Sequence, residues 1–440
     1  MLIINTPTDN LKERKYIIHI IFNEFLDIEY CHKTGSSNWD ITLDNNHKLI
    51  IEDHFFSKNK NDLDYLMPDS LPTKIEYTSN DFIIGRDIPI IFGNSSFNIT
   101  DSSSITCGID VFASIFFMVS RWEEFVNPSR DVHDRFPSTE SISYKNGFLN
   151  RPIVDEYIEM LMNMFLYLGF NKDRKLRKKQ LVLTHDIDRL YMWKNWLQVL
   201  RVAIGDILKR KSINLAKERF SEYNLIKSKK INDPYDTFDH LMNISDEYSL
   251  KSHFYFMSGG LTKYNNRYRI DEPKCIELIS KIKKRGHIIG FHPSYNAYND
   301  SIQFKKEKEK LEYAIGEEIR EGRGHYLRFE VPTTWQIWEN SGMKIDSTCG
   351  YADRVGFRCG TGQEYSVFNI LTREKLKLKE RPLLLMDTTL FGYQKLDQDI
   401  IRDLVINLSL HTNMFTVLWH NTQIQHMNDY EKLLSILYKS

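Results

Sequence analysis

Two aspartates stand two residues apart at the end of an apolar run, a spacing that suits metal-assisted hydrolysis. Asp186 and Asp188 follow Leu181-Val182-Leu183 within Thr184-His185-Asp186-Ile187-Asp188. Residues i and i+2 of a strand point to the same side, so both carboxylates can face one mouth. Two like charges at such a short separation require a cation or a proton between them. One aspartate can then bind a metal ion while the other acts as a base toward water. The structural alternative is an Asp pair that caps a turn after a buried strand.

Titratable residues also follow three later apolar runs. His292 comes after residues 288–291, Asp387 after residues 383–386, and His420 after residues 416–419. Because the carboxyl ends of parallel strands meet at one edge of a sheet or barrel, we expect these residues to converge with the aspartate pair. This repeated placement favours a functional site over a set of unrelated structural residues.

An alternation of strands and helices from residue 181 onward predicts the elements that must position these side chains. We expect helices at 237–248, 273–285, 304–319 and 333–341, and strands at 181–184, 252–256, 288–291, 325–329, 383–386 and 415–419. Repeated βα units imply a mostly parallel sheet or barrel. The predicted fold class of this part is therefore α/β.

The chain is predicted to contain two domains, because 440 residues exceed one ordinary core. Residues 1–170 are expected to form a smaller α/β domain of unknown role, and residues 180–440 the larger one. The smaller domain should contain a hairpin at 40–51, a strand at 88–93, and helices at 110–124 and 151–168. We see no catalytic constellation in it. A basic stretch at 172–179 marks the predicted boundary.

Composition narrows the function classes. Lys+Arg and Asp+Glu both total 59, so the net charge gives no support for bulk binding of nucleic acid. The 5 cysteines are scattered without paired spacing, which argues against a disulfide framework or a zinc knuckle. The N-terminal sequence lacks the pattern of a signal peptide, and no run has the length of a membrane span. A cytoplasmic location is expected.

A second basic tract, at residues 201–230, follows Trp193 and Trp196. Such tracts are commonly solvated helix faces. The alternative is a patch for an anionic headgroup or a sugar-lipid pyrophosphate, which would mean peripheral contact with a membrane or glycolipid.

Residues 180–425 resemble the polysaccharide deacetylase family, metal-dependent carbohydrate esterases with a distorted (β/α) barrel. The segment 184–188 is similar to the first family motif, which implies that Asp186 is the general base and Asp188 a metal ligand. The segment 286–292 resembles the second motif and implies that His292 is a ligand.

Two further motifs extend the resemblance. Arg323-Gly324-His325-Tyr326 resembles the family's Arg-x-x-Tyr, whose arginine holds the base, and residues 417–420 resemble the last motif, which implies that His420 is the general acid. Residues 322–328 and 346–361 resemble a subset found among bacterial surface-polysaccharide enzymes. Residues 110–124 and 146–149 resemble the uncharacterised N-terminal domain of that subset.

The chain departs from the family at Asn296. The family usually has a second histidine four residues after the first, and Asn296 holds that place here, which makes it the expected third ligand. Asparagine is a weak, neutral ligand, and His185 or His325 can compensate. The remaining expected site residues bind substrate; they are His325, Tyr326, Asp387 and Arg358.

The resemblance implies a metal-dependent hydrolase, with zinc as the expected ion. Its substrate would be an acetylated sugar of a bacterial surface poly- or oligosaccharide, or a precursor of one. Two alternatives stay open. A metal-free carbohydrate-binding pseudoenzyme is favoured by Asn296, but the retention of Asp186 and His420 argues against it. A small-molecule C–N amidohydrolase would require a deep, closed pocket.

Overall fold

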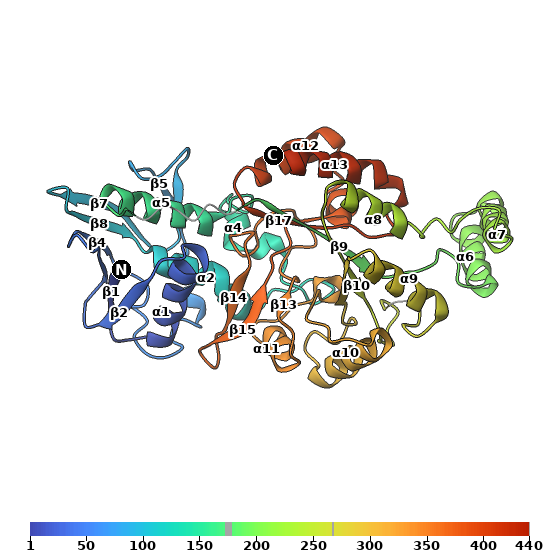
Figure 1. Ribbon diagram of the computed structural model, residues 1–440, viewed down its shortest axis with the longest axis horizontal. Coiled ribbons are helices and arrows are strands. Elements are labelled where there is room, and N and C mark those ends of the chain that lie inside the picture. Colours follow the sequence, from blue (N-terminus) through green and yellow to red (C-terminus); the bar gives the residue numbers. More distant parts are fainter. Residues whose placement is uncertain (172–177, 266–267, 440) are drawn as a thin grey trace.

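The computed structural model describes residues 1–171, 178–265 and 268–439, and it contains two main sheets (Figure 1). Both sheets carry helices, so the molecule is a mixed α/β protein. Residues 172–177, which make up most of the predicted boundary segment, lie outside the described residues. The division into domains at this place stays a prediction.

The first sheet is mixed and six-stranded. Its order is β2 (Tyr30–Thr34), β1 (Leu2–Thr6), β3 (Trp39–Thr42), β4 (Lys48–Ile51), β8 (Ser104–Ile109) and β7 (Gly93–Thr100). The predicted hairpin at 40–51 is confirmed, because β3 and β4 pair antiparallel. A separate antiparallel pair consists of β5 (Glu76–Thr78) and β6 (Ile88–Ile90).

Helices in the first 170 residues share an apolar core with this sheet. They are α1 (Leu11–Ile18), α2 (Val111–Ser120), α3 (Trp122–Val126), α4 (Ile142–Lys145) and α5 (Ile153–Tyr167). The expectation of one helix at 110–124 is wrong. Arg121 adopts a left-handed backbone conformation, with φ 55°, which ends α2 and starts α3. Its buried guanidinium then lies against Glu123 and Glu124, and this pairing accounts for the break.

The second sheet has nine strands. Its order is β14 (Tyr365–Asn369), β15 (Glu374–Glu380), β13 (Ile345–Asp346), β12 (Glu321–Gly322), β11 (Ile288–Phe291), β10 (Ser252–Phe256), β9 (Gln180–Ile187), β17 (Met414–Leu418) and β16 (Leu385–Met386). Pairings from β15 to β16 are all parallel, as predicted, and β14 pairs antiparallel with β15. The order is linear, and within the described ranges no pairing joins β14 to β16 to close a barrel.

Helices connect the parallel strands, as the βα pattern predicts. They are α8 (Phe238–Glu247), α9 (Pro273–Lys284), α10 (Ser301–Ile315), α11 (Thr333–Asn340), α12 (Gln398–Ser409) and α13 (Met427–Lys439). The expected strand at 325–329 is wrong. Residues His325–Leu327 form a short 3-10 turn in which Tyr326 and Leu327 both have positive φ, a conformation that a strand does not allow.

The parts built on the two sheets are joined by one apolar core. The rings of Tyr16 and Phe368 lie 4.7 Å apart, and the Tyr16 hydroxyl donates to the Ser366 carbonyl at 2.9 Å. Backbone bonds cross the same junction, including one from the N–H of Val154 to the carbonyl of Gly360 at 2.9 Å. The first 170 residues are therefore packed against the second sheet.

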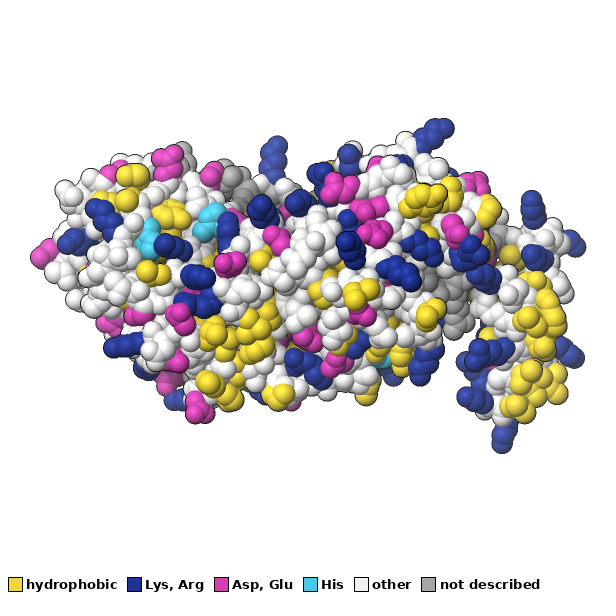
Figure 2. All heavy atoms as spheres, turned by 90° about the horizontal axis from the view of Figure 1, so that it is seen from below, with side chains coloured by type: hydrophobic (Ala, Val, Ile, Leu, Met, Phe, Trp, Pro, Cys, Tyr) yellow, Lys and Arg dark blue, Asp and Glu magenta, His cyan; other side chains and the backbone are white. Residues whose placement is uncertain are grey.

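Two helices, α6 (Trp196–Leu208) and α7 (Ile213–Lys227), form a hairpin that stands clear of this body (Figures 1 and 2). They lie between β9 and α8 and contact each other along their length. In the part of the chain that the structure describes, each helix is too short or too polar to cross a bilayer.

Candidate functional site

The carboxyl ends of the parallel strands bring the predicted titratable residues together. Asp186 lies near the end of β9 and Asp188 one residue beyond it, while His292 directly follows β11. His420 comes two residues after β17. These four side chains line one pocket of about 420 Å³, a size common for small-ligand sites. The predicted convergence at one sheet edge is confirmed.

Asp186 is held by a fully buried arginine. Arg323 Nη1 donates to Asp186 Oδ1 at 3.0 Å and to Thr184 Oγ1 at 2.8 Å, while Nε donates to the Ser347 carbonyl at 2.8 Å. Arg323 does not line the pocket. It therefore positions Asp186, and the second carboxylate oxygen of Asp186 stays directed at the pocket, 3.8 Å from His292 Nε2.

A glycine lets the chain approach closely enough to place Arg323. Gly322 in β12 pairs with Phe291 of β11, and a Cβ atom at 322 would lie 1.9 Å from the Phe291 carbonyl oxygen. No side chain larger than hydrogen fits there. The glycine beside Arg323 in the sequence is thus required by strand packing.

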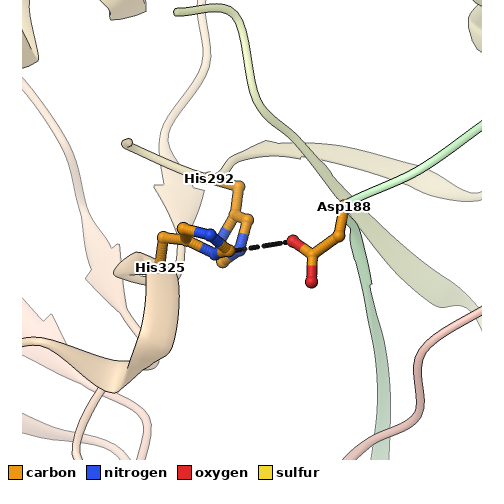
Figure 3. Close-up of side chains that lie close together, drawn as sticks. All are labelled: Asp188, His292 and His325. Carbon is orange, nitrogen blue, oxygen red and sulfur yellow. Dashed lines mark hydrogen bonds and ion pairs between the residues drawn. The ribbon is translucent and has the colours of Figure 1, made fainter. Parts of the chain in front are cut away.

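Asp188, His292 and His325 form a cluster whose potential ligand atoms all lie within 4.8 Å of one another (Figure 3). Asp188 Oδ1 is 3.4 Å from His292 Nε2 and 3.4 Å from His325 Nδ1, and the two ring nitrogens are 2.9 Å apart. Two ligands of one tetrahedral zinc ion are separated by roughly 3.3 Å, so these separations suit such a site.

Backbone carbonyls fix the tautomers of both rings. His292 Nδ1 lies 2.6 Å from the Arg323 carbonyl, and His325 Nε2 lies 2.7 Å from the Tyr264 carbonyl. A carbonyl oxygen only accepts, so each of these nitrogens carries the hydrogen and the other nitrogen of the neutral ring keeps a lone pair. The two lone pairs therefore face each other at Asp188, which requires a cation or a proton between them.

The electrostatics of the cluster also fit a cation. Asp188 Oδ1 is buried and has no hydrogen-bond partner among the described residues. Burial raises the pKa of this carboxyl, but the three histidines around it outweigh burial and hold the pKa well below its usual range. Burial lowers the pKa of His325 to about 4, so this ring is neutral and able to ligate. The donor set of two imidazoles and one carboxylate is one that zinc prefers.

Asn296, the expected third ligand, does not join this cluster. Its side chain is exposed, its amide oxygen accepts from Arg328 Nη1 at 3.4 Å, and it does not line the pocket. His185 is also elsewhere, since its ring contacts the Trp419 carbonyl and the Ser252 hydroxyl. His325, which was expected to bind substrate, occupies the third position instead. The chain brings it there through the turn at 325–327, which the sequence pattern did not predict.

His420 is paired with a buried carboxylate. Its Nδ1 lies 2.8 Å from Asp387 Oδ1, and its Nε2 faces the pocket 3.8 Å from Asp188 Oδ2. Burial alone would lower the pKa of His420, but Asp387, Asp188 and Asp186 raise it to about 10. Asp387 is fully buried behind the ring and does not line the pocket. Its expected role in substrate binding does not fit this placement, and it orients His420 instead.

The opposite wall of the pocket comes partly from the first 170 residues. His133 and Arg135 line it together with Tyr326 and Tyr393. The His133 ring lies 4.7 Å from that of Tyr326, and Arg135 Nη2 donates to the Tyr393 hydroxyl at 3.1 Å. The sequence pattern predicts no catalytic constellation in this half, and these two pocket-lining residues were not identified from it. The sequence signal for these two residues is the dense run of charged residues in Ser129-Arg130-Asp131-Val132-His133-Asp134-Arg135.

Arg358 was expected to bind substrate, and the structure places it elsewhere. It is buried, Nε donates to Glu124 Oε1 at 2.8 Å, Nη2 donates to Glu124 Oε2 at 2.5 Å, and it does not line the pocket. Its charge is therefore used to join the two parts of the chain. Tyr326 keeps the position on the pocket wall that its expected role requires.

A family of unknown function, DUF7033, matches residues 2–168. The comparison with curated proteins gives no match. Among solved structures, a candidate polysaccharide deacetylase from Mycobacterium smegmatis has a TM-score of 0.38 at 15% identity, over 61% of this chain and 86% of that one.

Two other structures are similar to a lesser degree. A CE4 family pseudoenzyme from Bacillus anthracis has a TM-score of 0.32 at 11% identity, over 60% of this chain and 61% of that one. A family 4 carbohydrate esterase from Streptomyces lividans, in complex with acetate, has a TM-score of 0.28 at 11% identity, over 59% of this chain and 90% of that one. These similarities are low, so the functional argument rests on the site itself.

Proposed function

We propose that the protein is a metal-dependent hydrolase that removes acetyl groups from a sugar of a bacterial surface polysaccharide or its precursor. The nine-stranded sheet is then a distorted form of the barrel of the polysaccharide deacetylases. One observation carries the proposal. Asp188, His292 and His325 direct three ligand atoms at one point, beside a second carboxylate, Asp186, and an acid, His420.

Each polar residue has a separate task in this proposal. Asp188, His292 and His325 hold a divalent ion, which supplies Lewis-acid polarisation of the acetyl carbonyl when bound. Asp186, fixed by Arg323 at 3.0 Å, accepts the proton of the attacking water. His420, fixed by Asp387 at 2.8 Å, donates a proton from Nε2 to the leaving amine or alkoxide.

The protonation of His420 and the hydrogen bonds of Asp186 support these roles. The raised pKa of His420 keeps the ring protonated at neutral pH, as a general acid requires. Asp186 has Arg323 as a fixed counter-charge, and Arg323 Nη1 donates from the buried side both to Asp186 Oδ1 and to the Thr184 hydroxyl. The proposed base and acid both line the pocket beside the Asp188 cluster, where an acetyl group can be attacked and released.

The shape of the pocket favours a sugar substituent over a small, fully enclosed substrate. Its walls carry His133, Tyr326 and Tyr393, which offer both aromatic faces and hydroxyl or imidazole partners for a sugar ring. Tyr295 supports this wall, since its ring lies 5.4 Å from that of Tyr326 and its hydroxyl lies 3.0 Å from His133 Nδ1. An acetyl group that enters between Asp186 and His420 can thus be attached to a ring packed on this wall.

Metal content and acetate release test the proposal. Protein purified without chelator should contain near-stoichiometric zinc or another divalent ion by elemental mass spectrometry, and it should release acetate from acetylated glycans. Asp188→Ala should lose both properties and keep the circular dichroism spectrum of the parent. Protein that binds no metal after zinc addition, yet binds glycans, would instead be a pseudoenzyme. Acetate release by metal-free protein would contradict the proposed mechanism.

A further inference from the structure

The hairpin of α6 and α7 is held by specific contacts and projects from the body of the molecule (Figure 1). Asn195 and Ser212 cap its helices by accepting from the N–H groups of Gln198 and Leu215. Asp206 is fully buried between the helices, where Arg210 and Arg219 pair with it. Asn421 joins the two chain segments at the base of the hairpin, because its Nδ2 donates to the carbonyls of Arg189 and Tyr235, both at 2.9 Å.

One face of α6 exposes apolar side chains to solvent. Trp196 is 55% exposed and Leu208 is 72% exposed, and the intervening residues of the face follow helical spacing; the face consists of Trp196, Leu197, Leu200, Ile204, Ile207 and Leu208. Val199 and Ala203, on the other side of the helix, are buried. Figure 2 shows this apolar face as a continuous band along the projecting hairpin. A helix with such a stripe ordinarily buries it.

Basic side chains surround the apolar face. The exposed ones are Arg201, Lys209, Arg210, Lys211, Lys217 and Lys227. Within Trp196–Lys227, all of which the structure describes, Asp206 is buried and Glu222 is half-buried against the Trp193 indole N–H, which leaves Glu218 as the exposed acidic residue. In Figure 2 the basic groups lie on both sides of the apolar band. The surface around the face is therefore strongly cationic.

We propose that this hairpin docks the protein on the surface of an anionic phospholipid bilayer. The 13 residues of α6 extend roughly 20 Å, less than the hydrocarbon thickness, so the helix lies in the interface and does not span it. Its aliphatic side chains and Trp196 enter the boundary between headgroups and acyl chains, while the basic residues contact lipid phosphates. Charge complementarity selects this occupant, because a second copy would bring two cationic rims together.

The proposal does not depend on the hydrolase function, although the hairpin begins directly after the site. The inserted segment leaves the sheet after Ile187, the residue before Asp188, and Asn421, which holds its base, follows His420. The hairpin and the pocket thus belong to the same edge of the sheet. Binding through α6 fixes the orientation of that edge relative to the lipid surface.

Sedimentation with vesicles tests the docking surface in the full-length chain. Vesicles of phosphatidylcholine with phosphatidylglycerol should bind the protein at least tenfold more tightly than vesicles of phosphatidylcholine alone, and added salt should weaken binding. Leu200→Ser with Ile204→Ser should lower the partition coefficient at least tenfold. Lys209→Gln with Lys211→Gln should lower it about 25-fold, since each basic residue contributes about fivefold.

Matched controls on α10 separate docking from general surface effects. Ile302→Ser with Tyr313→Ser changes two exposed hydrophobic residues, Lys305→Gln with Lys306→Gln changes two exposed basic ones, and both should leave vesicle binding unchanged. All variants should keep the parent melting temperature. The proposal is overturned if the parent protein does not bind anionic vesicles, or if the hairpin variants bind them as tightly as the parent does. It is also overturned if these variants abolish a dimer seen by light scattering without changing vesicle binding.

Discussion

At the scale of single residues, the third ligand decides what the site can do. Asn296 stands at the expected place in the sequence, but its side chain points to solvent and meets Arg328. His325 reaches the cluster from a different turn, with its Nε2 hydrogen committed to the Tyr264 carbonyl. The proposed metal site therefore does not need a ligand at 296, because the neutral imidazole of His325 lies with Asp188 and His292.

A pair of alanine substitutions distinguishes these two residues. His325→Ala should weaken zinc binding at least about 100-fold, because it removes a ligand from a site of three protein donors. Asn296→Ala should change zinc affinity by less than about twofold, since its amide is exposed and outside the pocket. Isothermal titration with zinc measures both values. The opposite ranking of the two variants would show that Asn296 and not His325 holds the metal.

The pairing of Asp387 with His420 predicts a pH dependence. Burial opposes the charged ring, but Asp387 is the largest of the contributions that raise the pKa of His420 to about 10. A general acid loses activity as pH rises through its pKa, so kcat/KM should fall on the alkaline side. Asp387→Asn removes the negative charge, lowers the pKa of His420, and should shift this alkaline limb to lower pH with a loss of roughly 10²- to 10⁴-fold in kcat.

A control for that variant is Asp397→Asn, which changes a carboxylate that caps α12 and does not line the pocket. It should leave the pH profile of kcat/KM in place. An alkaline limb that does not move in Asp387→Asn would mean that another group supplies the proton.

At the scale of elements, the sequence predicts the strands that follow from a periodic apolar pattern, and it misses the turns and short strands that depend on tertiary contacts. The strands whose carboxyl ends place Asp186, His292 and His420 in the site are apolar runs followed by polar residues, and all three strands are confirmed. The turn at His325–Leu327 has no such pattern, because its shape depends on positive φ at Tyr326 and Leu327. That turn carries the third ligand, so the ligand set could not be completed from the local sequence.

The short strands show the same limit. β12 and β13 have two residues each, and they exist because β11 and β15 lie on either side of them. The break at Arg121 likewise depends on Glu123 and Glu124 reaching back to a buried guanidinium. Residues Glu374-Lys375-Leu376-Lys377-Leu378-Lys379-Glu380 of β15 alternate in polarity, but no local signal identifies the place of β15 between its antiparallel partner β14 and its parallel partner β13.

At the scale of the whole molecule, buried charge pairs lock the first 170 residues onto the second sheet. Arg358 and Glu124 are both almost fully buried, and they form a bidentate pair that also involves Arg121. The same part of the chain places His133 and Arg135 in the pocket wall. Both parts therefore contribute to one pocket, in which the junction holds one wall against the strand ends that carry the proposed catalytic groups.

Removal of one partner from this junction should destabilise the protein in a pH-dependent way. Burial opposes ionisation of Glu124, but Arg358 and Arg121 lower its pKa from 4.5 to about 2. Since the folded-state pKa is depressed, the stabilisation is complete above the unfolded pKa and is lost as pH falls toward 2. Glu124→Gln should cost about 3–5 kcal/mol at pH 7. The difference from the parent should shrink by about 2 kcal/mol at pH 3. Denaturant unfolding at both pH values measures this difference in the free energy of unfolding.

As a control, Glu140→Gln removes an exposed partner of Lys145 and should cost less than about 1 kcal/mol at either pH. A pH-independent cost at Glu124 would mean that the carboxyl contributes through packing and not through its charge.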